Sequence, residues 1–233
     1  MGGQNSINMD KKSLDSNKTT RFLGVIPARG GSKRIPDKNI RMICGHPLVW
    51  WSIMAGLQSK LLDKVVVSSD DTRVLDIATS CGAETIMRPE DLSGDNLGLT
   101  PVLGHALELY PSMDCVVLLR PTSPIRVQNV IDKCVREFLR RGMDSLSTGY
   151  VCKNYEWGTM PDMPSQLMEG WFYNDGCVEV HRREVILAGE SFGERRYGLE
   201  VPQYFNYELD TELDWVIVSC LMEYLGLVYD HEG

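Results

Sequence analysis

The sequence has 233 residues, of which 43% are hydrophobic and 24% are charged, as in ordinary globular proteins. A chain of this length can bury a sizeable core without disulfide or metal cross-links, which excludes a small stapled scaffold. The net charge of −8 disfavours a general nucleic-acid-binding surface, although a small anionic ligand needs only a local basic patch.

The seven cysteines are scattered along the chain, with no CxxC pair and no histidine at metal-ligand spacing. This pattern is typical of reduced thiols and disfavours both a disulfide framework and a zinc site. No stretch approaches the roughly 18 apolar residues of a membrane span, and the N-terminus lacks a hydrophobic signal core. We therefore expect a cytoplasmic protein that binds neither a membrane nor a nucleic acid.

Strand and helix patterns alternate along the chain after a polar leader at 1–20, which we expect to be disordered. In chain order, the patterns predict a strand at 22–28, a helix at 47–60, a strand at 64–68, a helix at 71–81, a strand at 85–87, a helix from an N-cap at Thr100 to Tyr110, a strand at 115–119, a helix at 127–140, strands at 177–180 and 207–209, and a helix at 213–225. This alternation predicts an α/β domain over 21–233, with a mostly parallel sheet flanked by helices. The Trp-, Pro- and Met-bearing stretch within about 150–175 breaks the pattern and is interpreted as an excursion, either a lid or an oligomer contact.

A basic loop follows the first strand. Five basic residues lie within thirteen positions of this acidic chain: Arg29, Lys33, Arg34, Lys38 and Arg41. The adjacent pair Gly30-Gly31 lets the backbone approach a ligand closely and direct N–H groups at it. The spacing matches neither the P-loop nor the dinucleotide-binding motif. We interpret the loop as a binding site for several phosphates, and the alternative is a solvated basic loop.

Four segments carry a resemblance to a known family. The motifs at 26–39, 88–89, 118–126 and 208–214 look like the successive motifs of the acylneuraminate cytidylyltransferases, the CMP-sialic acid synthetases. The resemblance implies a Rossmann-like fold of the nucleotide-diphospho-sugar transferase type and a homodimer with a protruding segment. It also implies a Mg²⁺-dependent reaction of CTP with an acidic ulosonic sugar that yields a CMP-sugar and pyrophosphate.

By this resemblance, the nucleotide-binding residues are expected to be Ala28, Arg29, Gly30, Gly31, Ser32, Lys33, Lys38, Asn39, Arg88 and Asp95. Lys38 is the leading candidate for stabilising the leaving group, together with Arg29 and Lys33. For Arg88 and Asp95, a surface arginine and a loop aspartate are equally common alternatives. Asp70 could neighbour the sugar, but an N-cap for the next helix is the stronger interpretation.

Glu208 and Asp210 alternate on the predicted strand at 207–209 and beyond, so both carboxylates should lie on one face. Mg²⁺ prefers hard oxygen ligands and commonly uses only one or two protein carboxylates. The family more often has aspartate where this chain has Glu208. The alternative for Asp210 is an N-cap, and Thr211 with Asp214 also fits a capping box.

The resemblance implies that the sugar is bound by Arg120, Thr122, Ser123, Asn174 and Asp175. Two departures bear on its identity. Many family members carry Gln where this chain has Arg120, and the arginine that meets the sugar carboxylate in sialic-acid-specific members would fall near Ser165. A legionaminic, pseudaminic or deaminated neuraminic acid is therefore plausible, as is an eight-carbon ulosonic acid.

Two alternatives belong to other functional classes. One is a glycosyltransferase that uses Glu208 and Asp210 as its acidic metal motif, which the triphosphate-type loop disfavours. The other is a catalytically silent nucleotide-binding module. In that case nucleotide would bind without turnover, and Asp210→Ala would change nothing measurable.

Overall fold

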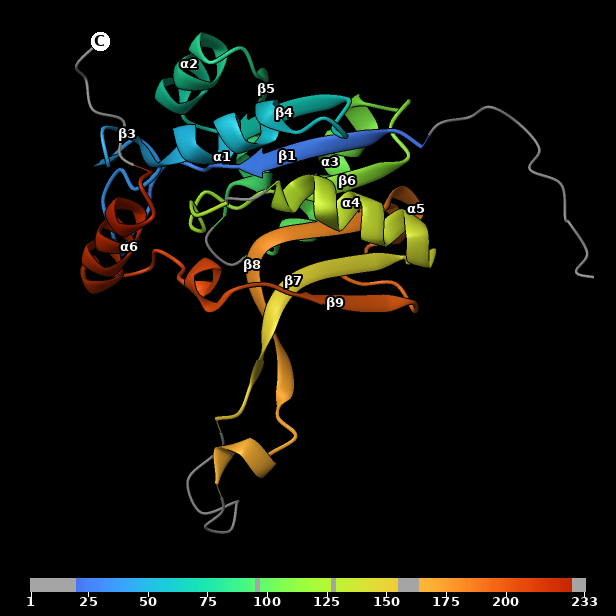
Figure 1. Ribbon diagram of the computed structural model, residues 1–233. Helices are drawn as coiled ribbons and strands as arrows, with labels where there is room; N and C mark the ends of the chain where they lie inside the picture. The colour runs from blue at the N-terminus through green and yellow to red at the C-terminus, as the bar shows by residue number, and fades with distance from the viewer. Residues whose placement is uncertain (1–19, 95–96, 127–128, 155–163, 228–233) are drawn as a thin grey trace, which may run out of the picture.

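The computed structural model describes residues 20–94, 97–126, 129–154 and 164–227. Within them, a seven-stranded sheet has the order β5-β4-β1-β6-β8-β7-β9, and helices cover it (Figure 1). The predicted α/β class is confirmed. The expected leader at 1–20 lies outside the described residues, except for Thr20.

The strands of the main sheet are β1 (Phe22–Pro27), β4 (Lys64–Ser69), β5 (Glu84–Met87), β6 (Cys115–Leu118), β7 (Ser145–Cys152), β8 (Trp171–Arg182) and β9 (Arg196–Glu200), and a small hairpin is formed by β2 (Met42–Ile43) and β3 (His46–Pro47). The helices are α1 (Leu48–Gln58), α2 (Thr72–Ser80), α3 (Leu99–Leu109), α4 (Val130–Arg141), α5 (Arg183–Leu187) and α6 (Glu212–Tyr224), with short 3₁₀ turns η1 (Glu90–Leu92), η2 (Ser165–Leu167) and η3 (Gln203–Asn206).

The sheet is parallel on one side and mixed on the other. β1 runs parallel to both β4 and β6, and β4 runs parallel to β5. β8 runs antiparallel to β6 and to β7, while β9 runs parallel to β7. The parallel strands therefore end at one edge of the sheet, where open α/β sheets bind their ligands.

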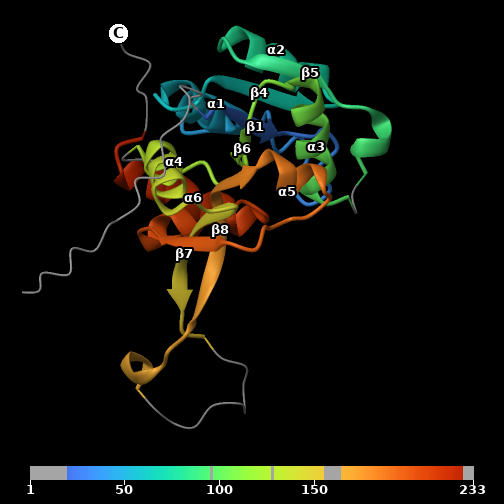
Figure 2. The same ribbon diagram turned by 90° about the vertical axis from the view of Figure 1, so that its right-hand side faces the viewer.

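The central strands are buried on both faces. In β1, Phe22 and Ile26 belong to the core shared with α1, α2, α4 and α6. Leu23 and Val25 point the other way, into the core shared with α3 and α5. Figure 2 shows these helices on opposite sides of the sheet. Burial on both faces explains the nearly continuous apolar run from which the strand was predicted.

Two helix starts differ from the prediction. Asp71, not Asp70, caps α2, because its side chain accepts a hydrogen bond from the Arg73 backbone N–H (2.9 Å). α3 begins at Leu99 with Gly98 at the N-cap, so the expected cap at Thr100 is wrong. The Thr100 hydroxyl lies 3.2 Å from that of Ser191 instead.

The mixed part of the sheet departs most from the sequence patterns. β7, β9 and α5 were not predicted, and β8 is longer than the expected strand at 177–180. The strand expected at 207–209 is wrong: this segment is irregular, and the Leu209 N–H donates to the Thr122 carbonyl (2.8 Å). The start of the helix expected at 127–140 lies partly outside the described residues, and α4 begins at Val130.

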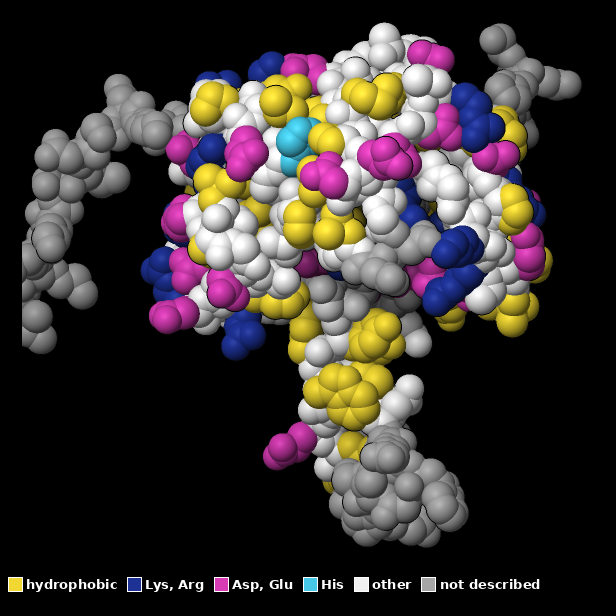
Figure 3. Space-filling view, turned by 180° about the vertical axis from the view of Figure 1, so that it is seen from behind, with side chains coloured by type: hydrophobic (Ala, Val, Ile, Leu, Met, Phe, Trp, Pro, Cys, Tyr) yellow, Lys and Arg dark blue, Asp and Glu magenta, His cyan; other side chains and the backbone are white. Residues whose placement is uncertain are grey.

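A two-stranded arm, formed by the far ends of β7 and β8, projects from the body (Figures 1 and 2). Its described residues are 149–154 and 164–174, and its ladder runs from the pair Gly149 and Asn174 to the pair Cys152 and Trp171. Exposed apolar side chains cover it, as Figure 3 shows: Val151, Leu167, Trp171, Phe172 and Tyr173. The arm lies within the predicted excursion, and its role as a lid or an oligomer contact stays a prediction.

Among the described residues, no helix combines the length and the apolar composition that a bilayer crossing requires.

Candidate active site

The basic loop after β1 is tied to the segment before α6. Lys38 Nζ donates to the Leu209 carbonyl (2.7 Å) and lies 3.2 Å from Asp210 Oδ1. Arg34 pairs with the other oxygen of the same carboxylate, at 3.1 Å. The side chain of Lys38 is 12% exposed, whereas that of Arg34 is 71% exposed. The structure thus brings the first and the last sequence motifs into contact, although 171 positions separate Lys38 from Leu209.

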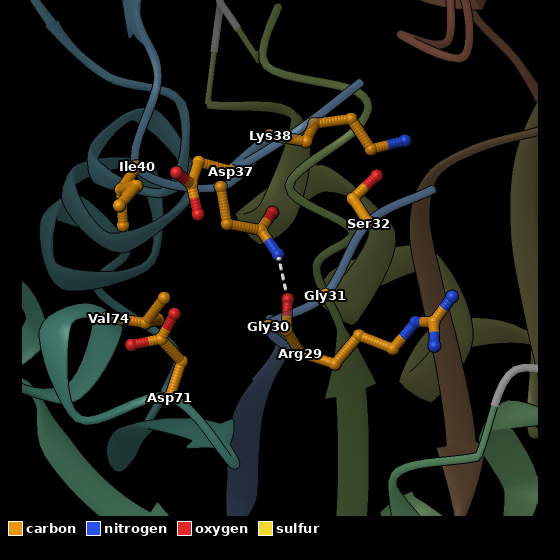
Figure 4. A pocket seen from close by; sticks show the side chains of 10 residues that line it. Arg29, Gly30, Gly31, Ser32, Asp37, Lys38, Ile40, Asp71 and Val74 are labelled. Atoms are coloured by element: carbon orange, nitrogen blue, oxygen red, sulfur yellow. Dashed lines mark hydrogen bonds between the residues drawn. The ribbon is translucent and has the colours of Figure 1, made fainter. Parts of the chain in front are cut away.

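Two basic side chains of the loop, those of Arg29 and Lys38, extend to the same side of it (Figure 4), whereas Arg41 pairs with Glu212 at the start of α6. Figure 4 shows Arg29, Ser32 and Lys38 directed away from Asp71. The Asn39 side-chain amide donates to the Arg29 carbonyl (2.8 Å), which braces the two ends of the loop and is drawn as a dashed line.

Glycine is required at Gly31, whose φ of +61° lies in the left-handed region. The neighbouring Gly30 N–H donates to Asp70 Oδ1 (2.7 Å), and the Ala28 N–H donates to the Ser68 carbonyl (3.0 Å). Asp70 therefore shapes the loop rather than capping α2. Lys33 is exposed on the same loop.

A cleft of about 210 Å³ opens beside this loop. It is lined by Pro27, Arg29, Ser32, Lys38, Asn39, Arg88, Leu99, Arg120, Pro121 and Thr122. These residues come from the loops that follow β1, β5 and β6, together with the start of α3. Four of them are cationic, so the cleft gathers positive charge from three separate motifs, as an anionic ligand requires.

Arg88 is buried rather than on the surface, with 5% of its area exposed. Its guanidinium donates to the Ser68 hydroxyl (3.1 Å) and the Ser68 carbonyl (2.6 Å) at the end of β4. Burial lowers the pKa of Arg88, and the neighbouring charge of Arg29 lowers it further. Asp95, predicted to lie near the nucleoside, falls outside the described residues.

Arg120 lies between two carboxylates that the mixed part of the chain supplies. Its NH2 donates to Glu179 Oε1 (2.5 Å), and its NH1 lies 3.4 Å from Glu208 Oε1. Burial raises the pKa of Glu208; the charge of Arg120 opposes that rise and Asp210 adds to it. Burial alone would raise the pKa of Glu179, but the contact with His181 and the charge of Arg120 hold it below its ordinary value.

Two functional residues were missed from the sequence. Glu179 could have been found, because it is a lone carboxylate in the apolar run of the predicted strand at 177–180. Arg126 closes the motif at 118–126, but no local signal shows that its guanidinium donates to the carbonyls of Arg120 (2.7 Å) and Cys177 (2.8 Å). Burial lowers the pKa of Arg126. These bonds hold the backbone beneath Arg120.

The other residues predicted to contact the sugar differ in their accessibility. Thr122 lines the cleft. Asp175 and Ser123 are each 1% exposed, and Asp175 Oδ1 accepts from the Thr148 hydroxyl (2.5 Å) and the Cys177 N–H (2.9 Å). Burial raises the pKa of Asp175. A sugar contact through Asp175 or Ser123 stays a prediction, and it would require this turn to open.

Asn174 lines a second cavity, of about 280 Å³, and its side-chain oxygen accepts from the Gly176 N–H (2.8 Å). The cavity lies against β7, β8 and β9 and is lined by Ser145, Leu146, Ser147, Phe172, Asn174, Phe192, Arg196, Tyr197 and Gly198. It is therefore a largely apolar hollow with a few polar groups, as is common for small-molecule sites.

The predicted metal ligands flank the buried Leu209. Thr211 is the N-cap of α6, and Asp214 completes the predicted capping box, so capping does not occupy Asp210. Within the described part of the chain, no group of three or more His, Cys, Asp or Glu residues could hold a metal ion. The two carboxylates nevertheless fit Mg²⁺, which accepts one or two protein oxygens when phosphates and water complete its shell.

Comparison with known proteins identifies the family to which this chain belongs. A family model described as cytidylyltransferase matches residues 23–156. The CMP-N,N'-diacetyllegionaminic acid synthase of Legionella pneumophila is 30% identical over 227 residues, which cover 87% of this chain and 97% of that protein. An N-acylneuraminate cytidylyltransferase of Escherichia coli is 38% identical over 117 residues, which cover 50% of this chain and 28% of that protein.

Among solved structures, a CMP:2-keto-3-deoxy-manno-octonic acid synthetase complexed with CTP has a TM-score of 0.68 at 18% identity, and the match covers 88% of this chain and 100% of that one. This likeness confirms the fold, and the relatives confirm the resemblance drawn from the four motifs. With a family match over more than half of its length and a relative covered almost end to end, the chain belongs to the cytidylyltransferase family and is a nucleotidyltransferase.

Proposed function

We propose that this enzyme transfers CMP from CTP to the anomeric hydroxyl of a nonulosonic, sialic-acid-like sugar and releases pyrophosphate. The observation that carries the proposal is the single cleft in which Arg29, Lys38, Arg88 and Arg120 meet. The named activities of the two relatives described above support a nine-carbon acid.

The chemistry needs positioning and charge stabilisation more than a protein nucleophile. The sugar hydroxyl attacks the α-phosphorus and loses its proton to solvent, a P–O bond forms, and the bond to the β-phosphate breaks as its electron pair leaves with pyrophosphate. Arg29 and Lys38, on one side of the loop, are suited to hold the triphosphate and to stabilise the charge that grows on the leaving group. Lys33, exposed on the same loop, is a further candidate for the outer phosphates.

Glu208 and Asp210 are the residues that would hold Mg²⁺. When bound, the ion would neutralise phosphate charge and polarise phosphoryl oxygens. Lys38 and Arg34 both pair with Asp210, so these cations orient the carboxylate beside the cleft. Entry of a triphosphate would give both cations a competing partner, which couples nucleotide binding to the availability of Asp210.

The sugar is proposed to lie between Arg120 and the apolar cavity beside Asn174. Glu179 connects Arg120 to this cavity, because it pairs with Arg120 and also contacts Asn174, which lies on the same strand, β8. A cavity of about 280 Å³ with aromatic walls suits the apolar and acylamido decorations of a nonulosonic acid.

A homodimer is also proposed, with the arm as the contact. Trp171 is 52% exposed and Tyr173 is 47% exposed, and a cluster of exposed aromatic side chains on a projecting ribbon is stabilised by burial against a partner. Light scattering on the purified chain should give the mass of two copies, and a Trp171→Ser, Phe172→Ser variant should shift it to one. A monomeric wild-type chain would contradict the dimer.

The activity is tested by measuring pyrophosphate release with CTP, Mg²⁺ and a panel of eight- and nine-carbon ulosonic acids. ATP, GTP and UTP serve as nucleotide controls, and Asp210→Asn is the variant for the metal site. We expect turnover with CTP and a nine-carbon acid, and a higher Mg²⁺ requirement in Asp210→Asn.

If only an eight-carbon acid is turned over, the proposed substrate is wrong but the proposed cytidylyl transfer stands. CTP binding without turnover on any acid would overturn the proposal and leave the silent nucleotide-binding module. CMP-sugar consumption with an acceptor would favour the glycosyltransferase.

A further inference from the structure

A chain of polar contacts crosses the sheet beneath Arg120. Arg120 NH2 donates to Glu179 Oε1 (2.5 Å), and the other oxygen of Glu179 lies 3.4 Å from His181 Nε2. His181 Nδ1 lies 3.0 Å from the Ser145 hydroxyl. Glu179 is 4% exposed and His181 is 2% exposed, so only the Arg120 end of the chain reaches the cleft.

The charge around Arg120 is already compensated. Glu179 lies directly against the guanidinium, and Glu208 approaches it from the segment before α6. A carboxylate arriving from a substrate would therefore meet a guanidinium whose charge is already paired with Glu179, which weakens a second ion pair at Arg120.

Arg120 nevertheless keeps unused hydrogen-bonding capacity. A guanidinium carries five N–H donors. The Arg120 Nε is buried and has no partner, and the NH1 contact with Glu208 is long at 3.4 Å. Such a group can donate directed hydrogen bonds to neutral oxygens even where its net charge is cancelled.

We propose that Glu179 is the positioning residue of the sugar site. It fixes the orientation of Arg120 and cancels its charge, so that Arg120 donates hydrogen bonds to a neutral hydroxyl or acylamido oxygen of the sugar instead of acting as the counter-ion of the sugar carboxylate. The inference rests on the proposed function.

The test uses the full chain and four variants: Arg120→Gln, Glu179→Gln, the double variant, and Glu84→Gln as a control for a glutamate outside the cleft. For each, KM for the sugar, KM for CTP, kcat and the melting temperature are measured. Glu84 pairs with Lys64 and Tyr110 at the far edge of the sheet, so its change should leave the sugar KM within about twofold.

Each single change should raise the sugar KM about 10-fold or more while KM for CTP changes less than about threefold. In Glu179→Gln, Arg120 is released toward Glu208. In Arg120→Gln, the buried Glu179 loses its counter-charge, which should also lower the melting temperature. The double variant is neutral and keeps amide donors, so it should regain sugar affinity and melting temperature relative to Arg120→Gln.

The following outcomes would distinguish a failure of the inference about Glu179 from a failure of the proposed function. Additive losses in the double variant would show that Glu179 and Arg120 act independently, and a lowered sugar KM in Glu179→Gln would show that Arg120 binds the sugar through its charge. Either result would overturn the inference while leaving the activity intact. Equal effects on the KM for CTP and the KM for the sugar would show that Glu179 supports the whole active site and not the sugar site in particular. This result would also overturn the inference. No turnover by the wild-type chain with any acid would overturn the proposed function, and the inference with it.

Discussion

The parallel strands β5, β4, β1 and β6 and the mixed strands β8, β7 and β9 contribute opposite charges to the cleft. The loops that follow β1, β5 and β6 supply Arg29, Lys38, Arg88 and Arg120. β8 and the segment before α6 supply Glu179, Glu208 and Asp210. Cations for a nucleotide thus come from one half of the sheet, and the carboxylates that orient or neutralise them come from the other.

The two halves also differ in how they are held together. The parallel strands are buried on both faces by apolar side chains, so hydrophobic burial stabilises them. The mixed strands also contribute apolar residues to this core, such as Leu146 and Val178, but they carry buried polar groups as well, among them Thr148, Asp175 and His181. Substitutions of side chains at the cleft should therefore act mainly on catalysis or substrate binding, whereas substitutions at buried positions of either half should act mainly on stability.

The largest effect is expected for Lys38→Ala. Loss of the one lysine of the cleft removes charge from the leaving group, and kcat should fall about 100- to 1,000-fold. Pyrophosphate release at saturating CTP measures it. Lys133→Ala on the exposed side of α4 is the control, with a change below about twofold. A fall in kcat of less than about tenfold in Lys38→Ala would show that Lys38 does not stabilise the leaving group.

A pair of glycine substitutions compares the packing of the two halves. A Cβ at Gly149 in β7 would overlap the Tyr173 carbonyl oxygen, a backbone atom that cannot move alone. A Cβ at Gly24 in β1 would meet the end of the Leu62 side chain at 2.8 Å, which can rotate away. In urea unfolding, Gly149→Ala should destabilise the chain by about 2–3 kcal/mol and Gly24→Ala by about 1 kcal/mol. The reverse order would contradict the comparison.

Asp144→Asn tests an ion pair that joins β7 to the start of β9. The Arg195 guanidinium and backbone N–H hold the pKa of Asp144 at about 2, below its ordinary value. A lowered carboxyl pKa stabilises the fold above the unfolded pKa of about 4, and this contribution is lost as the pH falls toward 2.

Asp144→Asn should therefore cost about 1 kcal/mol at pH 7 and progressively less as the pH falls through about 2, as measured by denaturant unfolding at each pH. Arg195→Met should show the same loss at pH 7, and the double variant should add little to it. A loss that persists unchanged near pH 2 would exclude the ion pair as its cause.

The smallest effect is expected for Arg34→Gln. Arg34 and Lys38 both contact Asp210, but Arg34 is largely exposed and does not line the cleft. An exposed ion pair contributes about 0–1 kcal/mol, so kcat/KM for CTP should fall less than about threefold. A loss as large as that of Lys38→Ala would mean that both cations hold the triphosphate.

Local pattern was sufficient for the parallel half. β1, β4, β5 and β6 were predicted close to their true ends. In β1, β4 and β6 the signal is a short apolar run, whereas β5 is only half apolar. The capping box of Thr211 and Asp214 was also predicted, since its two residues are three positions apart and need no tertiary contact. The basic loop was recognised from its composition and from its place after a buried strand.

The mixed half was not predicted, because β7 and β9 lack a local sequence pattern. β7 begins Ser-Leu-Ser-Thr-Gly and β9 begins with Arg196, so neither has an apolar run or a clear alternation. They are strands because β8 pairs with β7, and β7 in turn with β9, over long sequence separations. Pairings of this kind depend on register and burial, which a local window does not contain.

By itself the sequence determined the fold class, the family and the identity of the basic loop, because these depend on short motifs and on hydrophobic periodicity. The tertiary structure decided that Lys38 meets Asp210, that Arg88 is buried against Ser68, and that Arg120 is neutralised by Glu179. The physical reason is that charge compensation and desolvation are set by neighbours in space, and here those neighbours lie 20 to 172 positions apart along the chain.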